Sequence, residues 1–346
     1  MTVRIQRIII LLLLALTGAS ASAAIPADST VLRYLPTVHG TFRGWYEIDT
    51  GSGDSRFLIR NARLSATGMV LPKVDYSLQM DFCDKGRIEL VDAYVRVSPQ
   101  SRLKIFFGKS RVPFSVSACR AKQKYYFFNR SFIGKYAGNL HNVGIKAGYS
   151  IGGTPLYVEG GVFNATDYKD QPEWNSAGLT YSIKANAALP GGLTPEICFM
   201  SRQNGTAGAG TRMNQFDASI HWEHGPWTAE AEYLYSDVCG PYPVSHQYDF
   251  ILQYTQGLRG PWVNAISYGA RFDGHTKASS GFYTDGEITT DYPEVKRLTL
   301  GLTATCRRGD AHFDLRLNYE NYFYRSGTIP SDKADDKVCA GVVLYF

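Results

Sequence analysis

The chain has 346 residues, 44% of them hydrophobic and 19% charged, and a formal net charge of +5. After the first 24 residues no apolar run approaches the roughly 20 residues that a membrane-spanning helix needs, so helical membrane proteins are excluded. The six cysteines form neither a CxxC pair nor a zinc pattern. P-loop and Rossmann signatures are absent as well, and we expect no metal and no cofactor.

The amino-terminal residues have the pattern of a secretory signal peptide. Arg4 and Arg7 precede an apolar run at residues 8–16, and small residues follow as far as Ala24. Such a pattern predicts cleavage and export. We therefore expect a signal peptide at residues 1–23 and one domain at residues 24–346, with an uncleaved membrane anchor as the alternative.

Regular alternation of apolar and polar residues predicts β-strands in the rest of the chain. In Asp75–Phe82 every second residue is apolar, which places the apolar side chains on one face of a strand. Sixteen segments of this kind follow one another: 38–48, 57–68, 73–83, 87–97, 101–109, 142–150, 155–164, 175–186, 192–201, 212–223, 226–236, 246–255, 262–273, 295–305, 310–324 and 336–346. Most have about the ten residues that a tilted transmembrane strand requires.

The connections between these segments alternate in length. Those after even-numbered segments are short turns, such as 151–154, and those after odd-numbered segments are mostly long, with 110–141 the longest. Short periplasmic turns and long outer loops are typical of outer-membrane barrels. We therefore expect an all-β protein, a closed transmembrane antiparallel β-barrel of about 16 strands, in the outer membrane of a Gram-negative bacterium. Its terminal Phe346 is typical of strands that the outer-membrane assembly machinery recognises.

An acid-free stretch carries the strongest functional signal. No Asp or Glu occurs between Asp92 and Glu159, while Lys and Arg are frequent, many of them in the long third loop at 110–141. Because a ring of cations at a narrow point of a pore favours anions, we expect this loop to fold inward and form a constriction. The candidate anion-pathway residues are Lys104, Lys109, Arg111, Arg120, Lys122, Lys124, Arg130, Lys135 and Lys146.

Alternation also suggests cations on the barrel wall. The candidates that face the lumen are Arg60, Lys184 and Arg316, and Arg63 is expected on the opposite face from Arg60. Two alternatives stay open. The loop could lie outside and pair with lipopolysaccharide phosphates, or carboxylates such as Asp81, Glu230 or Glu232 could offset the wall charges.

Short motifs around the basic loop resemble a known family. Phe107-Gly108-Lys109, the run Arg111–Ser115 and the preceding Val91–Tyr94 are similar to segments of the phosphate-selective porin O and P family, over roughly residues 40–165. The resemblance implies a sixteen-stranded, usually trimeric porin with a basic third loop and small anions, phosphate among them, as solutes. One departure is Asn129 before Arg130, where the family often has Glu.

Other functions are weighed against the pore. An enzyme is not expected, because the seven histidines are scattered and no GxSxG motif occurs. Nucleic-acid binding is not expected of an exported chain. A structural or adhesive barrel without significant conductance remains the alternative. A disulfide between Cys83 and Cys119, which would fix the loop to the wall, is a further hypothesis.

Overall fold

The computed structural model describes residues 34–84, 87–137, 140–165, 178–203, 212–238, 244–276, 293–325 and 335–346. Residues 36–346 form one compact unit. The expected signal peptide lies outside the described residues, as does Cys239. No helix among the described residues is long and apolar enough to cross a bilayer.

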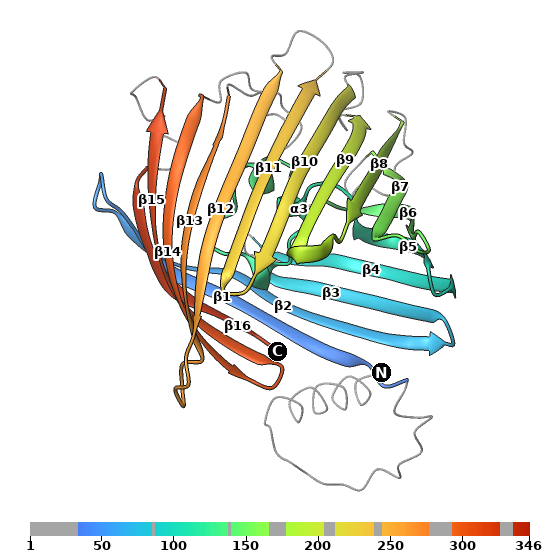
Figure 1. The fold of residues 1–346 in the computed structure, drawn as a ribbon, viewed down its shortest axis with the longest axis horizontal. Coiled ribbons are helices and arrows are strands. Elements are labelled where there is room, and N and C mark those ends of the chain that lie inside the picture. Colours follow the sequence, from blue (N-terminus) through green and yellow to red (C-terminus); the bar gives the residue numbers. More distant parts are fainter. Residues whose placement is uncertain are drawn as a thin grey trace, which may run out of the picture. The chain divides into compact units, whose positions relative to one another are not determined.

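Sixteen strands close into an antiparallel barrel in which each strand pairs with its sequence neighbours and β1 pairs with β16 (Figure 1). The strands are β1 Thr37–Asp49, β2 Ser55–Leu71, β3 Val74–Asp84, β4 Arg87–Gln100, β5 Leu103–Arg111, β6 His141–Ser150, β7 Leu156–Asn164, β8 Leu179–Ala187, β9 Leu193–Gln203, β10 Arg212–His224, β11 Trp227–Val238, β12 Ser245–Gly257, β13 Ala265–His275, β14 Val295–Arg308, β15 Ala311–Tyr324 and β16 Lys337–Tyr345. The predicted sixteen-stranded barrel is confirmed, with boundaries within a few residues of those expected.

The two faces of the wall differ as the alternation predicts. On β15, Leu315 and Leu317 point outward and are 51% and 49% exposed, whereas Arg316 and Asn318 point inward and are 7% and 1% exposed. Closure satisfies the backbone hydrogen bonds without a free edge, and this is what allows a sheet to sit in lipid. The polar core and apolar exterior invert the arrangement of a water-soluble protein.

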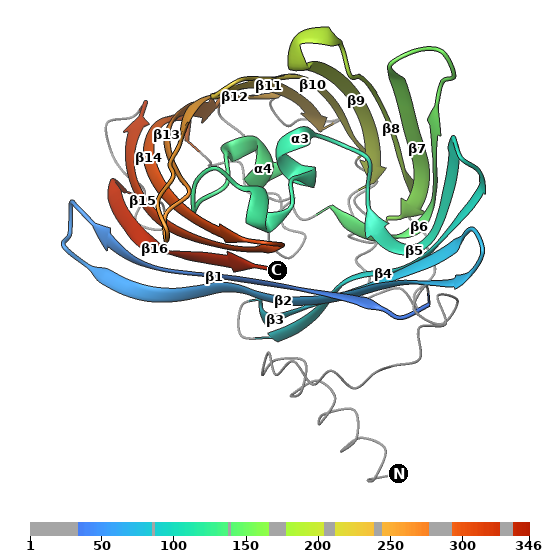
Figure 2. The ribbon, with the colours of Figure 1, turned by 60° about the horizontal axis from the view of Figure 1, so that its bottom comes forward.

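The segment between β5 and β6 contains three short helices: α3 Val116–Cys119, the 3₁₀ helix η1 Lys122–Lys124, and α4 Phe132–Tyr136. We call residues 112–137 the interior segment. Figure 2 shows α3 and α4 inside the ring of strands. Ser115 and Ser131 cap α3 and α4 by accepting hydrogen bonds from Ala118 N and Gly134 N, each at 3.1 Å.

One glycine and one bulge shape the wall near this segment. Gly108 has φ +121°, and a Cβ there would lie 2.3 Å from the Ala93 carbonyl oxygen, so the close approach of β4 and β5 requires glycine. On the other side, the register of β1 and β2 shifts between Arg43 and Gly44, which leaves Arg60 as the extra residue of a β-bulge.

Candidate pore constriction

The interior segment is fixed first to β11. Ser115, whose φ of 56° lies in the left-handed region, donates from Oγ to Glu232 Oε1 at 2.6 Å. The backbone N–H of Ser117 donates to Glu232 Oε2 at 3.1 Å, and Arg120 forms an ion pair with Glu230. Three anchors to two carboxylates hold α3 and the following turn against the wall.

A second set of anchors reaches β13 and β14. The Phe132 N–H donates to Asp273 Oδ2 at 2.8 Å. In the other direction, Arg271 Nη1 donates to the carbonyl of Asn129 at 2.9 Å, and Arg297 Nη2 donates to that of Arg130 at 2.6 Å. Because both Arg side chains also form ion pairs with Asp273, wall and segment share one charged network.

A third contact reaches β1. Arg43 Nη2 donates to the Phe128 carbonyl at 2.6 Å, and the ring of Phe128 stacks on Trp45 with centroids 5.0 Å apart. Between these anchors the segment contributes Val112, Phe114 and Ile133 to an apolar cluster in the barrel. The segment thus crosses from β5 to several distant strands and is packed against the inner wall.

Cations gather around Tyr125 of this segment. The Arg43 guanidinium carbon, Lys122 Nζ and the Arg130 guanidinium carbon lie 4.9, 5.3 and 5.9 Å from the centre of its ring, and Lys122 Nζ donates to its hydroxyl at 2.9 Å. The ring face attracts all three charges. Burial, and then the nearby cations Arg130, Arg63, Arg43 and Arg111, hold the pKa of Lys122 well below its usual value.

The predicted residues fall into two groups. Most of the buried ones form ion pairs with carboxylates: Lys109–Glu89 at 3.9 Å, Lys146–Glu159 at 2.9 Å, Lys184–Glu196 at 3.5 Å, Arg316–Asp314 at 2.6 Å and the pair Arg120–Glu230. Arg111 donates to His141 Nε2 at 3.2 Å. The exposed ones are Lys104, Lys124, Lys135 and Arg60. Carboxylates therefore offset much of the expected positive charge.

Two sequence-based expectations are wrong. Arg63 does not face away from the lumen: its Nε lies 2.7 Å from the buried Asp81 on the inner side, because the bulge at Arg60 changes the alternation. The proposed disulfide is not formed, since the thiols of Cys83 and Cys119 are both free. Cys119 Sγ instead lies 3.0 Å from the Phe114 carbonyl oxygen.

Three arginines of this region are not among the residues that the sequence predicts for the site. Arg43, Arg271 and Arg297 lie on strands far from the basic stretch, and each is at most 3% exposed. Alternation with apolar neighbours marks Arg271 as lumen-facing, as in Ala270-Arg271-Phe272, whereas Arg297 follows Lys296 and has a weaker pattern. It carries no information about contact with a loop that lies 85 to 167 residues away in the sequence.

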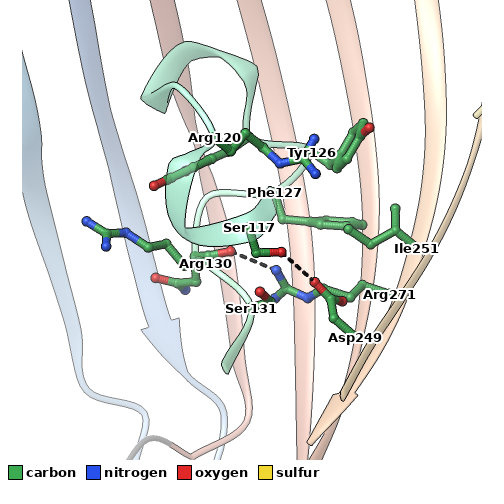
Figure 3. A pocket seen from close by; sticks show the side chains of 11 residues that line it. Ser117, Arg120, Tyr126, Phe127, Arg130, Ser131, Asp249, Ile251 and Arg271 are labelled. Carbon is green, nitrogen blue, oxygen red and sulfur yellow. Dashed lines mark hydrogen bonds between the residues drawn. The ribbon is translucent and has the colours of Figure 1, made fainter. Parts of the chain in front are cut away.

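A small cavity of about 20 Å³, large enough for about one water molecule, lies between the interior segment and the wall (Figure 3). Its lining includes Ser117, Arg130, Asp249 and Arg271. Figure 3 shows Ser117 directed toward Asp249, where its Oγ donates to Oδ2 at 3.4 Å. The cavity is too small for a solute pathway. It lies at the interface between the interior segment and the barrel wall.

The architecture matches known porins. A loop-deletion mutant of OmpT from Vibrio cholerae gives a TM-score of 0.61 at 13% identity, covering 91% of this chain and 100% of that one. An anion-selective porin from Comamonas acidovorans gives 0.61 at 12% identity, covering 90% and 99%. OmpF of Salmonella typhi, in complex with daunomycin, gives 0.60 at 12%, covering 91% and 98%. At such identities the likeness shows the fold alone.

The family comparison adds to this. Residues 37–191, just under half of the chain, match the model of the phosphate-selective porin O and P family. No curated protein matches the sequence. The resemblance noted in the sequence is confirmed over this segment. Family match and fold together identify a porin barrel of the Gram-negative outer membrane, a class of channels and not of enzymes.

Proposed function

We propose that this barrel is a passive pore for small anions, phosphate or related oxyanions, and that the interior segment is its constriction. The observation that carries the proposal is the group of cations around Tyr125, in which Lys122 and Arg130 of the segment lie near Arg43 of the wall. Low-dielectric walls focus the field of such a group on the narrow part of a lumen.

The exposed lysines would line the path along which anions reach the cations around Tyr125. Lys104 shares a strand face with Phe106, whose ring lies 4.7 Å from Lys146 Nζ inside the barrel. Lys124 and Lys135 are exposed on the interior segment. The remaining candidates, Lys109, Arg111, Arg120, Lys146, Arg60, Lys184 and Arg316, would then tune the potential of the lumen or hold the segment in place.

The test is the reversal potential of the refolded chain in a planar bilayer under a KCl gradient. We expect anion preference, reduced conductance on adding phosphate, and a shift toward cations in the double variant Lys104→Glu, Lys124→Glu. Lys73→Glu, on the exposed turn between β2 and β3, is the matched control and should leave selectivity unchanged. A cation-selective wild type, or equal selectivity in both variants, would overturn the anion path.

A structural or adhesive barrel is the second candidate, favoured by the number of anchors that hold the interior segment inside the barrel. It predicts no conductance in the same bilayer experiment.

We also propose that the chain is exported by a signal peptide at residues 1–23, is assembled through its C-terminal strand, contacts lipopolysaccharide and forms a homotrimer. One of the similar structures, OmpT of Vibrio cholerae, is described as a trimer. Mass photometry of the micelle-bound protein tests the last point.

A further inference from the structure

A cluster of acidic side chains lies in the barrel interior where α3 meets the wall. One carboxylate oxygen each from Glu230, Glu232 and Asp249 lies within 4.8 Å of the others. Glu232 is directly opposite Asp249 in the pairing of β11 with β12, and Asp217 of β10 lies against Glu232. The four residues are at most 4% exposed.

The charges of this cluster are not balanced by the ion pairs of the described residues. Arg120 and His221 both pair with Glu230. Glu232 accepts hydrogen bonds from Ser115 and Ser117, which are neutral, and Asp249 accepts one from Ser117. Glu232, Asp249 and Asp217 thus form no ion pair with the described residues, and buried carboxylates without a paired cation are costly in a medium of low dielectric constant.

Two further buried groups in this cluster have oxygen atoms without partners. Asp217 is fully buried beside the Glu232 carboxylate, and no N–H or hydroxyl donor of the described residues reaches either of its carboxylate oxygens. Ser219 Oγ likewise has no hydrogen-bond partner among these residues. Ser219 is 8% exposed, shares the inner face of β10 with Asp217 and is directly opposite Glu232. Unsatisfied buried oxygens beside carboxylates indicate that a group is missing from their surroundings.

We propose that Glu230, Glu232 and Asp249, with Asp217 and Ser219, bind one divalent cation, and that Ca²⁺ fits the site best. Ca²⁺ takes six to eight oxygen ligands at about 2.3–2.6 Å, and carboxylates supply most of them in proteins. Two ligands on opposite sides of such an ion are about 4.8 Å apart. The three carboxylate oxygens lie within 4.8 Å of one another, so one ion of this size can reach all of them. Mg²⁺ keeps several waters and is usually held by one or two carboxylates, so a buried cage of several carboxylates suits Ca²⁺ better.

The ion would also fix the interior segment. Ser115 and Ser117 of that segment donate to Glu232, so a cation that holds the carboxylates in place also orders the site at which α3 docks. This inference does not depend on the proposed anion selectivity. Calcium binding and reversal potential are separate measurements, and either proposal can fail without the other.

The test is calorimetric titration of the refolded, lipopolysaccharide-free chain with CaCl₂ in zwitterionic detergent after treatment with a chelator. We expect one saturable Ca²⁺ site, weaker binding of Mg²⁺, and a higher melting temperature with Ca²⁺. The double variant Glu232→Gln, Asp249→Asn should lose at least tenfold in affinity. Asp75→Asn, which removes a carboxylate paired with Arg96 on another part of the wall, is the matched control and should bind normally.

Several outcomes would overturn the proposal. No saturable binding up to millimolar Ca²⁺ at pH 8 means that the carboxylates share protons instead of a cation. Equal affinity of wild type and double variant means that the ion binds elsewhere. If the double variant does not fold, Ser219→Ala retains all carboxylates and should still weaken binding several-fold, and an unchanged affinity there also contradicts the site.

Discussion

At the scale of single residues, Tyr125 explains how like charges can lie close together in this barrel. Three cations lie within 6 Å of the centre of one ring, and two of them, Arg43 and Arg130, also donate to the carbonyls of Phe128 and Gly134. Hydrogen bonds and ring contacts compensate part of the repulsion. Lys122 differs from its neighbours because burial readily lowers the pKa of an ammonium group, whereas a guanidinium keeps its charge.

This difference predicts a pH dependence of selectivity. Because the pKa of Lys122 lies well below 10.5, its charge is lost at a lower pH than that of an exposed lysine. As the pH rises, anion preference should therefore start to decrease before pH 10 is reached. The variant Lys122→Arg should retain its anion preference. The same lowered pKa also affects the stability of the fold. As the pH rises from the folded-state pKa of Lys122 to its unfolded-state pKa, the free energy of unfolding increases, because in this range the unfolded chain still binds the proton and the folded protein does not.

Reversal potentials measured from pH 6 to 10 for both proteins check this prediction. Lys124→Arg is the matched control, because Lys124 is an exposed lysine two residues away. It should follow the wild type over the whole range. A wild-type selectivity that stays constant until pH 10 would show that Lys122 has no influence on the permeating ion.

At the scale of elements, the sequence predicts the strands far better than the site. Alternation depends on local periodicity alone, so β12, expected at 246–255, is a regular strand at Ser245–Gly257. The bulge at Arg60 adds one residue without any mark in the alternation, and the predicted side of Arg63 was wrong for that reason. The partner of Arg120, Glu230 on β11, depends on which strand lies beside the interior segment, which periodicity does not encode.

The interior segment should loosen when one of its anchors is removed. Arg297 joins Asp273 and Glu320 of the wall to the carbonyl of Arg130, and it is 3% exposed. Arg297→Gln leaves two buried carboxylates without this partner, which costs about 3–5 kcal/mol for a buried pair. We expect larger single-channel conductance and weaker anion preference, because the segment is held less firmly.

The matched control is Arg325→Gln. Arg325 pairs with Glu294 at 2.8 Å, but its side chain is 77% exposed, so the pair contributes at most about 1 kcal/mol. Urea unfolding in micelles and conductance traces separate the two variants. Equal conductance of Arg297→Gln and the wild type would show that the remaining anchors hold the segment without Arg297.

At the scale of the whole molecule, the barrel is defined by what faces outward. Large apolar residues such as Phe107, Phe250 and Leu300 are 48–69% exposed on the outer face, while charged groups fill the interior. In water this surface would aggregate, so the fold is stable only where lipid covers it. Closure depends on the ends of the chain, where Gly40 and Phe346 exchange backbone hydrogen bonds of 3.1 and 3.2 Å.

A charge on the outer face tests this arrangement directly. Leu317 lies in the middle of β15 and is 49% exposed, so Leu317→Arg would place a guanidinium in hydrocarbon and should cost about 2–4 kcal/mol at the bilayer midplane. Leu344→Arg, next to the end of β16, should cost at most about 1 kcal/mol, because the charge reaches the interface. Reversible unfolding in lipid vesicles measures both. Equal costs at the two positions would contradict a membrane centred on the middle of β15, and no cost at either would mean that lipid does not cover this face.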